Sequence, residues 1–237
     1  MSGHSHWSGI KRKKALLDSK KAKIFTRLGR AIVVASRLGG SNPDFNPALR
    51  LAIQKAKEAN MPKDRVDNLV KKAGDRENAE LEEIVYEAVG PFGTMLMILA
   101  ITDKRNRTVS ELRKILEDRG GKMADGGVGW NFRRAGFIDM EIEFEKKEEW
   151  LEKIMELGVD DFEERTKNRL RLLVDLNFLF KVRNSLPEDV IDNFGVGYFP
   201  KTRIKLTPEE KKLYNGLIEE LKENPDIQEV FDNVVWI

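Results

Sequence analysis

The residues with the clearest capacity for chemistry are lysines and arginines near the N-terminus. From Lys20 to Arg37 they recur at helical spacing, which places them on one face of an α-helix, and a run from Lys11 extends the charge toward the terminus. Such a face can bind phosphates and release their counterions, so it is typical of proteins that bind nucleic acid. The predicted nucleic-acid-binding residues are Lys11, Arg12, Lys13, Lys14, Lys20, Lys21, Lys23, Arg27, Arg30 and Arg37.

The alternative for this stripe is a charged helix face that meets only solvent. Such faces usually mix both signs, whereas up to Arg30 the segment carries nine basic residues and one acidic residue, Asp18. Trp7 precedes the basic run and is a candidate for stacking on a base, or else an anchor into a helical bundle.

A second candidate anion site lies in residues 102–108, between an apolar run and a helical pattern. Arg105 and Arg107 at a helix N-terminus suit a phosphate. In the alternative, Asn106 and Thr108 cap the helix while the arginines pair with acidic neighbours, and both interpretations stay open. The glycines at 120, 121, 126, 127 and 129 follow a helix, so we interpret them as turns and not as a phosphate loop.

Enzymatic chemistry has few candidates in this chain. There is no cysteine, and the only histidines, His4 and His6, lie in the N-terminal segment. We therefore expect no histidine base in a folded site. We expect no catalytic residue, no metal, no cofactor and no small-molecule substrate. A metal-dependent nuclease that uses Asp103 is a remote alternative, since no set of metal ligands clusters around it in the sequence.

The charge is divided unevenly along the chain. Residues 1–74 hold 17 Lys and Arg against 5 Asp and Glu, a formal charge of +12, whereas residues 75–237 carry a formal charge of −10. The longest apolar run, Met95–Ile101, is too short to span a membrane, and the polar N-terminus lacks the apolar stretch of a secretory signal. We therefore expect a cytoplasmic protein, with a basic helical arm for nucleic acid and an acidic body that can contact a protein partner.

Three helices are predicted before Gly74. The first has an apolar stripe from Phe25 to Ala35 and stops at Gly39-Gly40. Asn46-Pro47 starts the second as cap and first-turn proline, and Asn60-Met61-Pro62 separates it from the third.

After residue 78 the apolar period changes from 3.6 to 2, which marks the start of a sheet. Strands are predicted at 83–89, 94–101, 128–132 and 227–237, with capping boxes that open helices at Thr108 and Thr207. Between them, a strand alternating from Ile138 to Phe144, a helix, two strands, a helix from about Phe178 and a strand at 202–206 form the βαββαβ order of a ferredoxin-like unit.

The predicted fold is therefore α+β, with an N-terminal helical bundle followed by two α/β domains, one inserted in the other. The predicted domains are residues 1–76 (basic, helical), 77–134 plus 207–237 (α/β) and 135–206 (the inserted ferredoxin-like unit).

Short motifs throughout the chain resemble the YebC/PmpR family, also called translational-activator-of-cytochrome-oxidase-like. They include Gly3-His4-Ser5-His6-Trp7, Arg37-Leu38-Gly39-Gly40, Asn60-Met61-Pro62-Lys63, Gly90-Pro91 and Arg105-Asn106-Arg107-Thr108. The resemblance implies three domains and a cytoplasmic regulator of gene expression, either a DNA-binding transcriptional regulator or a translational activator that acts at the ribosome. We expect the first, with a ribosome-associated, RNA-binding activator as the alternative.

Overall fold

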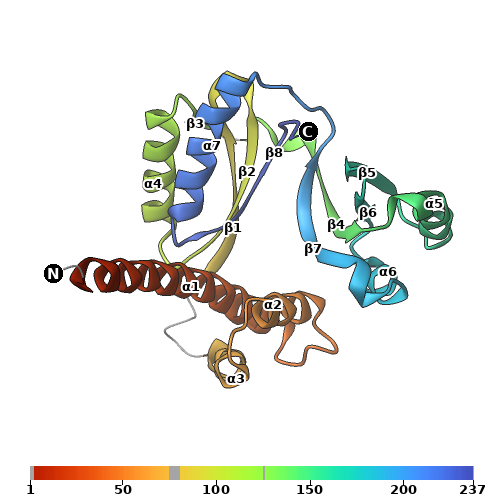
Figure 1. The fold of residues 1–237 in the computed structure, drawn as a ribbon, viewed down its shortest axis with the longest axis horizontal. Coiled ribbons are helices and arrows are strands. Elements are labelled where there is room, and N and C mark those ends of the chain that lie inside the picture. Colours follow the sequence, from red (N-terminus) through yellow and green to blue (C-terminus); the bar gives the residue numbers. More distant parts are fainter. Residues whose placement is uncertain (1–2, 75–80, 125, 237) are drawn as a thin grey trace. The chain divides into compact units, whose positions relative to one another are not determined.

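The computed structural model describes residues 3–74, 81–124 and 126–236 (Figure 1). In the first helix, it describes the side chains of residues 18 and 19 and of all residues from 21 onward. Its contacts divide the chain into two compact units. Unit 1 contains residues 1–85, 99–115 and 218–229, and unit 2 contains residues 86–98, 116–217 and 230–237. Within the described ranges, no helix combines the length and the apolar character that crossing a membrane requires.

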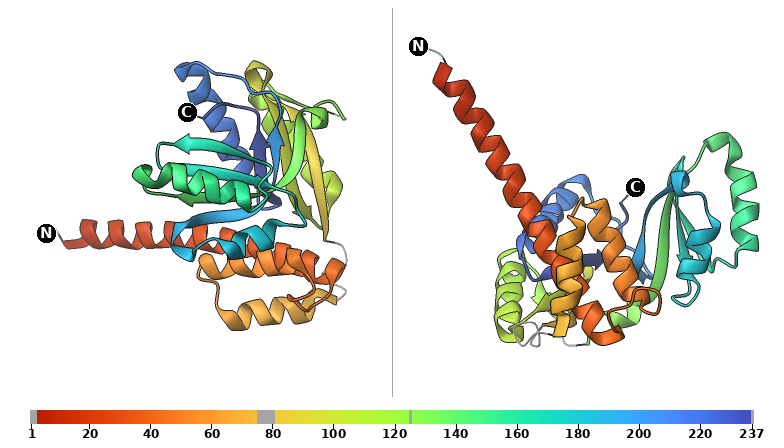
Figure 2. Two further views of the ribbon diagram at one scale, coloured as in Figure 1. Left: turned by 90° about the vertical axis from the view of Figure 1, so that its right-hand side faces the viewer. Right: turned by 90° about the horizontal axis from the view of Figure 1, so that it is seen from below.

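The chain begins with three α-helices, as predicted. They are α1 (Gly3–Gly39), α2 (Pro47–Glu58) and α3 (Lys63–Lys71), and a 3-10 turn, η1 (Lys72–Gly74), follows α3. The predicted stop of α1 is confirmed, because Gly40 adopts a φ of +86°, which suits a glycine after a helix end. Figures 1 and 2 show α2 and α3 along the C-terminal half of α1, while its N-terminal half extends beyond both of them.

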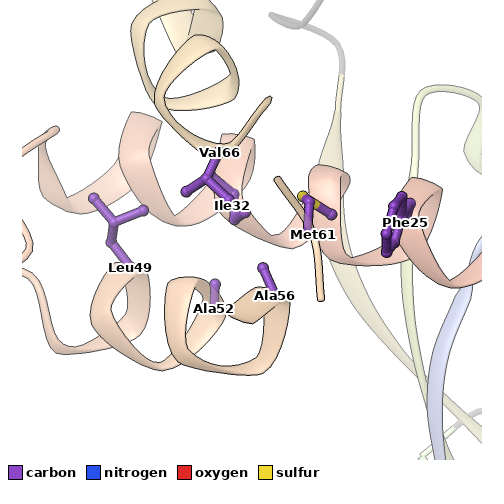
Figure 3. Close-up of a cluster of buried hydrophobic side chains, with 7 residues drawn as sticks. All are labelled: Phe25, Ile32, Leu49, Ala52, Ala56, Met61 and Val66. Atoms are coloured by element: carbon purple, nitrogen blue, oxygen red, sulfur yellow. The ribbon is translucent and has the colours of Figure 1, made fainter. Parts of the chain in front are cut away.

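A buried apolar cluster joins the three helices (Figure 3). The predicted stripe of α1 contributes Phe25 and Ile32, and α2 contributes Leu49, Ala52 and Ala56, the side that its sequence pattern indicated. Met61, in the turn before α3, and Val66 of α3 complete the cluster. The bundle therefore has a core of its own, to which the described side chains of α1 contribute from Phe25 onward.

Asn46 fixes the start of α2 in the predicted way. Its side-chain oxygen accepts the N–H of Leu49 at 3.0 Å, and Pro47 occupies the first turn. The Asn46 amide also donates to the carbonyl oxygens of Ala35 and Gly40, at 2.7 and 2.8 Å. One cap residue thus ties the end of α1 to the beginning of α2.

The first sheet has four strands in the order β3-β1-β2-β8. Its strands are β1 (Glu82–Val89), β2 (Met95–Thr102), β3 (Lys122–Met123) and β8 (Ile227–Asp232). Helix α4 (Arg105–Asp118) follows β2 in the sequence, and α7 (Pro208–Glu223) precedes β8. The capping box at the start of α7 is confirmed: the Thr207 N–H donates to Glu210 Oε2 at 2.8 Å, and the Glu210 N–H donates to Thr207 Oγ1 at 3.3 Å.

The second sheet is antiparallel, with the order β5-β6-β4-β7. Its elements follow the predicted βαββαβ sequence: β4 (Phe132–Glu141), α5 (Lys147–Glu156), β5 (Asp161–Thr166), β6 (Arg169–Val174), α6 (Leu179–Ser185) and β7 (Ile191–Pro200). The α+β class is thereby confirmed. All of these strands lie between β3 and β8 in the sequence, and the predicted domain boundaries stay predictions.

Three details of the strand and helix predictions were wrong. The last strand of the second sheet is residues 191–200 and not 202–206, where Ile204 forms only an isolated bridge to Val234. Residues 129–131 form a 3-10 turn, and β4 runs from Phe132 to Glu141 in place of the two strands predicted at 128–132 and 138–144. Thr108 does not cap α4, because the helix begins at Arg105 and the Thr108 N–H already donates to the carbonyl of Lys104.

Candidate nucleic-acid interface

The predicted basic residues of α1 fall into two groups. Lys11 to Lys14 and Lys20 lie in the part of the helix that precedes the buried cluster at Phe25. Their side chains, and that of Trp7, are outside the described part of the structure, so their binding role stays a prediction. Lys21 is exposed, with its ammonium nitrogen 5.4 Å from the centre of the Phe25 ring.

From Lys23 onward, the basic side chains contact unit 1 itself. Lys23 forms an ion pair with Glu223 at the end of α7. Arg27 donates from Nη2 to the carbonyl of Asn224 at 3.5 Å, and burial lowers the pKa of Arg27 while the charge of Glu223 opposes that shift. Arg37 donates to the carbonyl of Leu81. This half of the stripe is therefore a packing face as well as a charged one.

Asp226, which follows α7, accepts two of the predicted cations. Its side chain is 1% exposed, and Arg30 Nη1 lies 2.5 Å from Oδ1. Arg30 Nη1 also donates to the carbonyls of Ile101 and Pro225, each at 3.1 Å. On the other oxygen, Oδ2, Asp226 accepts Arg107 Nη2 at 2.9 Å. The two sites that the sequence predicted separately, in α1 and at residues 102–108, thus meet at one carboxylate.

Two buried threonines complete the hydrogen bonding of Asp226. Thr108 donates to Oδ2 at 2.7 Å and Thr102 donates to the same oxygen at 3.0 Å. Burial by itself would raise the pKa of Asp226, but hydrogen bonds from Arg107, Thr108, Arg30 and Thr102 lower it to about 2. The carboxylate is therefore charged, and both of its oxygens accept hydrogen bonds from residues of unit 1.

The two arginines of the second candidate site have different surroundings. Arg107 pairs with Asp103 at 2.9 Å as well as with Asp226, and the bond to Asp226 is the main cause of its raised pKa. This is the pairing that the alternative interpretation anticipated for the arginines. Arg105, at the first position of α4, is exposed. Of the two, Arg105 is the better placed to meet a phosphate, and such a contact stays a prediction.

Sequence reasoning did not identify Asp226 as part of either site. It lies 119 residues beyond Arg107 and 196 beyond Arg30. The one local signal is an aspartate directly before a predicted strand, in the segment Asn224-Pro225-Asp226-Ile227, where a carboxylate must find partners if it is buried.

Possible metal ligands and stacking aromatic residues are the other groups that bear on function. Among the described ranges, no group of three or more His, Cys, Asp or Glu is arranged to hold a metal ion. Asp103, on which the nuclease alternative rests, pairs with Arg107. In the second sheet, the aromatic side chains Phe137 and Phe199 are buried beneath the guanidinium of Arg171, 4.8 and 5.7 Å from the ring centres. These two rings are therefore covered and not available for base stacking.

Comparison with known proteins covers nearly the whole chain. Residues 5–76 match the family described as "TACO1/YebC protein N-terminal domain", and residues 81–234 match "TACO1/YebC second and third domain". A relative from Fervidobacterium nodosum is 42% identical, over 98% of this chain and 93% of the relative, and one from Aquifex aeolicus is 39% identical, over 98% and 95%. Both bear the name "Probable transcriptional regulatory protein".

A solved structure shares this fold. The crystal structure of a conserved hypothetical protein from Aquifex aeolicus superposes with a TM-score of 0.80 and is 35% identical in sequence. The match covers 92% of this chain and 91% of that protein. The arrangement of N-terminal helices followed by two four-stranded sheets is therefore that of a known structure.

Proposed function

The chain belongs to the TACO1/YebC family, and we propose that it is a cytoplasmic, non-enzymatic regulator of gene expression that binds nucleic acid through the N-terminal half of α1. Relatives named as probable transcriptional regulatory proteins support a regulatory role. We place binding to DNA in transcriptional regulation first, and binding to RNA as a ribosome-associated translational activator second.

One observation carries this proposal: the cations from Lys11 to Lys21 belong to the N-terminal half of α1, which extends beyond α2 and α3 (Figures 1 and 2). Residues 3–24 would span about 33 Å at the rise of an α-helix, enough to follow several phosphates. This segment holds seven Lys and Arg and the single acidic residue Asp18. Lys23 pairs with Glu223, and Arg27, Arg30 and Arg37 also contact unit 1. We therefore assign the phosphate contacts to the earlier residues: Lys11, Arg12, Lys13, Lys14, Lys20 and Lys21.

The composition of this segment favours contacts to the backbone of a nucleic acid over reading of bases. Residues 11–23 contain no Asn or Gln and one Arg, whereas side chains that read base edges in the major groove are chiefly Arg, Asn and Gln. Phosphate contacts position a protein without specifying sequence. This is the reason for keeping the RNA-binding alternative beside the DNA-binding one.

The decisive experiment replaces Lys11, Arg12, Lys13 and Lys14 with Gln. Binding of a labelled DNA duplex and of an RNA hairpin is measured by fluorescence anisotropy between 50 and 300 mM salt. We expect weaker binding to both and a salt slope reduced by about 0.7 to 0.9 for each lost phosphate contact. The matched control removes the same number of positive charges from unit 2, with Gln at the exposed residues Lys153, Lys167, Lys181 and Lys212. It should keep the wild-type salt slope.

The outcomes separate the competing functions. Equal loss in both four-residue variants would mean that net charge, and not the arm, controls binding, and the proposal would fail. A preference for the DNA duplex supports transcriptional regulation, whereas a preference for RNA together with cosedimentation with ribosomes supports the translational alternative. Cleavage of either probe with Mg²⁺, abolished by Asp103→Asn, would contradict the non-enzymatic assignment.

A further inference from the structure

Unit 2 contains an exposed tryptophan that follows the glycines at 126, 127 and 129. Trp130 is 62% exposed, although tryptophan usually buries most of its surface. Its indole Nε1–H donates to the carbonyl of Gly127 at 3.1 Å, so the ring is held against its own loop. This hydrogen bond favours one orientation of the exposed ring.

Glu87 of β1 holds this loop from within. Its Oε2 accepts the backbone N–H groups of Val128 and Gly129, each at 2.8 Å, and its carbonyl accepts the N–H of Ala124 at 2.8 Å. A Cβ on Gly129 would lie 2.8 Å from Glu87 Oε1, so the glycine allows this close approach. The glycines here thus form turns around a carboxylate, as the sequence indicated, and they leave no room for a phosphate at that position.

Asn131 fixes the other end of the loop to residues 201 and 202. The buried Asn131 side chain exchanges two hydrogen bonds with the backbone of Thr202, at 2.8 and 2.9 Å. The backbone carbonyl of Asn131 accepts the Lys201 N–H at 2.7 Å. The Lys201 ammonium donates to the carbonyl of Trp130 at 2.9 Å. A cation is therefore held at the backbone of the residue that carries the exposed ring.

The two segments that meet at Asn131 are basic, although the chain after residue 74 is acidic. Residues 119–134 and 199–205 contain seven Lys and Arg and one acidic residue, Asp125. Some of these cations pair within unit 2, since Arg133 lies 3.8 Å from Asp161 and Arg203 pairs with Glu163. Lys122, Arg134 and Lys205 are exposed, as is Lys201.

We propose that Trp130 is a stacking platform for an unpaired base of a nucleic acid, with Lys201 and the neighbouring exposed cations binding the adjoining phosphates. An exposed planar ring with cations beside it is the combination that proteins use to bind single strands, because every base has a face that can stack. A base inside a duplex is already stacked on its neighbours, so this contact selects unpaired nucleotides. The inference rests on the proposed function and adds to it a preference for single-stranded segments.

The test measures the affinity of the full-length protein for a fluorescein-labelled 12-nucleotide single strand and for a duplex of the same sequence. Trp130→Ala should weaken binding to the single strand about tenfold, equivalent to about 1.4 kcal/mol, and change binding to the duplex less than twofold. Trp130→Phe should retain most of the single-strand affinity, because it keeps a flat ring. Phe178→Ala removes another exposed aromatic residue of unit 2, 52% exposed, and should behave like the wild type.

Each result has a defined meaning. Equal single-strand affinity for Trp130→Ala and the wild type would overturn the stacking platform, and so would an equal loss in Trp130→Ala and Phe178→Ala. If Trp130→Ala instead lost binding to a protein partner and kept its affinity for single strands, the surface would be a protein interface and the inference would be wrong. Failure of the wild type to bind either probe would reject the proposed function as well. If the α1 variant lost affinity for the single strand and Trp130→Ala did not, the inference alone would be rejected.

Discussion

Arg30 of α1 and Asp226, which precedes β8, form an ion pair with 2.5 Å between Nη1 and Oδ1. The carboxylate is almost completely buried and the arginine side chain is 22% exposed. Because Asp226 also accepts Arg107 of α4 and two threonine hydroxyls, one side chain connects the basic helix to the start of α4 and to the end of β2. Arg30, which the sequence pattern assigned to phosphate binding, therefore also stabilises unit 1.

The charge of Asp226 should make stability depend on acid pH. Its pKa in the folded protein, about 2, lies below the ordinary value of 3.8, so the contribution to stability is complete above about pH 5 and is lost as the pH falls toward the folded pKa. The loss should be about 2 kcal/mol. The measurement is the free energy of unfolding of unit 1, from urea titrations between pH 7 and pH 2.

Asp226→Asn is the reference for this prediction. It should be less stable than the wild type at pH 7 by about 3 kcal/mol, because it leaves the partly buried Arg30 without its counter-charge. Its stability should fall less steeply with acid, since the titrating group is gone. Parallel curves for the two proteins would show that other carboxylates control the acid response. The exposed Asp189→Asn should follow the wild type within about 0.5 kcal/mol.

The turn between β1 and β2 carries a strained phenylalanine. Phe92 has φ +61° and ψ +21°, a left-handed conformation that is costly for a bulky residue, and its side chain is 44% exposed. Hydrogen bonds from Gly90 N–H to the Thr94 carbonyl and from Thr94 Oγ1 to the Pro91 carbonyl hold the turn in this shape. The strain is therefore imposed by the neighbours of Phe92.

Phe92→Gly should consequently be more stable than Phe92→Ala by about 1 kcal/mol, since both variants lose the ring and only glycine relieves the backbone. This order reverses the usual preference for alanine over glycine, which loses more conformational freedom on folding. Thermal unfolding of the two variants measures the difference. If the alanine variant melted at the same temperature or higher, the left-handed conformation at this position would not be costly.

Two of the three predicted helix caps formed as the local sequence indicated, whereas the box predicted at Thr108 was wrong because α4 begins at Arg105. The Asn46 cap and the reciprocal Thr207–Glu210 box each need only contacts three residues apart, and both formed as predicted. The strand at 191–200 was missed because Asn193, Gly195 and Gly197 interrupt its apolar alternation. A Cβ at Gly197 would lie 2.8 Å from the ring of Phe231, so packing against β8 and not strand propensity accounts for that glycine.

The candidate site was predictable in its residue types and not in its internal partners. The apolar pattern of α1 indicates one buried face, whereas Val33 and Val34 are also buried, in a second cluster with Ala73, Leu81 and Ile101. These valines lie three and four positions after Arg30 and precede Arg37 by the same spacings, so the basic stripe adjoins a packed surface. Partners such as Asp226, distant in the sequence, follow from the tertiary fold alone.

Arg30 and Lys20 should differ in what their removal affects, although the sequence assigns both to one basic stripe. Arg30→Ala deprives the buried Asp226 of a charged partner and should lower the free energy of unfolding by about 3 kcal/mol. Because its guanidinium already binds Asp226 and two carbonyls, the salt slope of nucleic-acid binding should stay within error of the wild-type value. Lys20→Ala should do the reverse, with a change in stability below about 0.5 kcal/mol and a salt slope reduced by about 0.7 to 0.9.

Urea titrations and anisotropy at several salt concentrations measure the two quantities on the same preparations. A reduced slope for Arg30→Ala at a temperature where the variant is folded would show that Arg30 leaves Asp226 to contact phosphate.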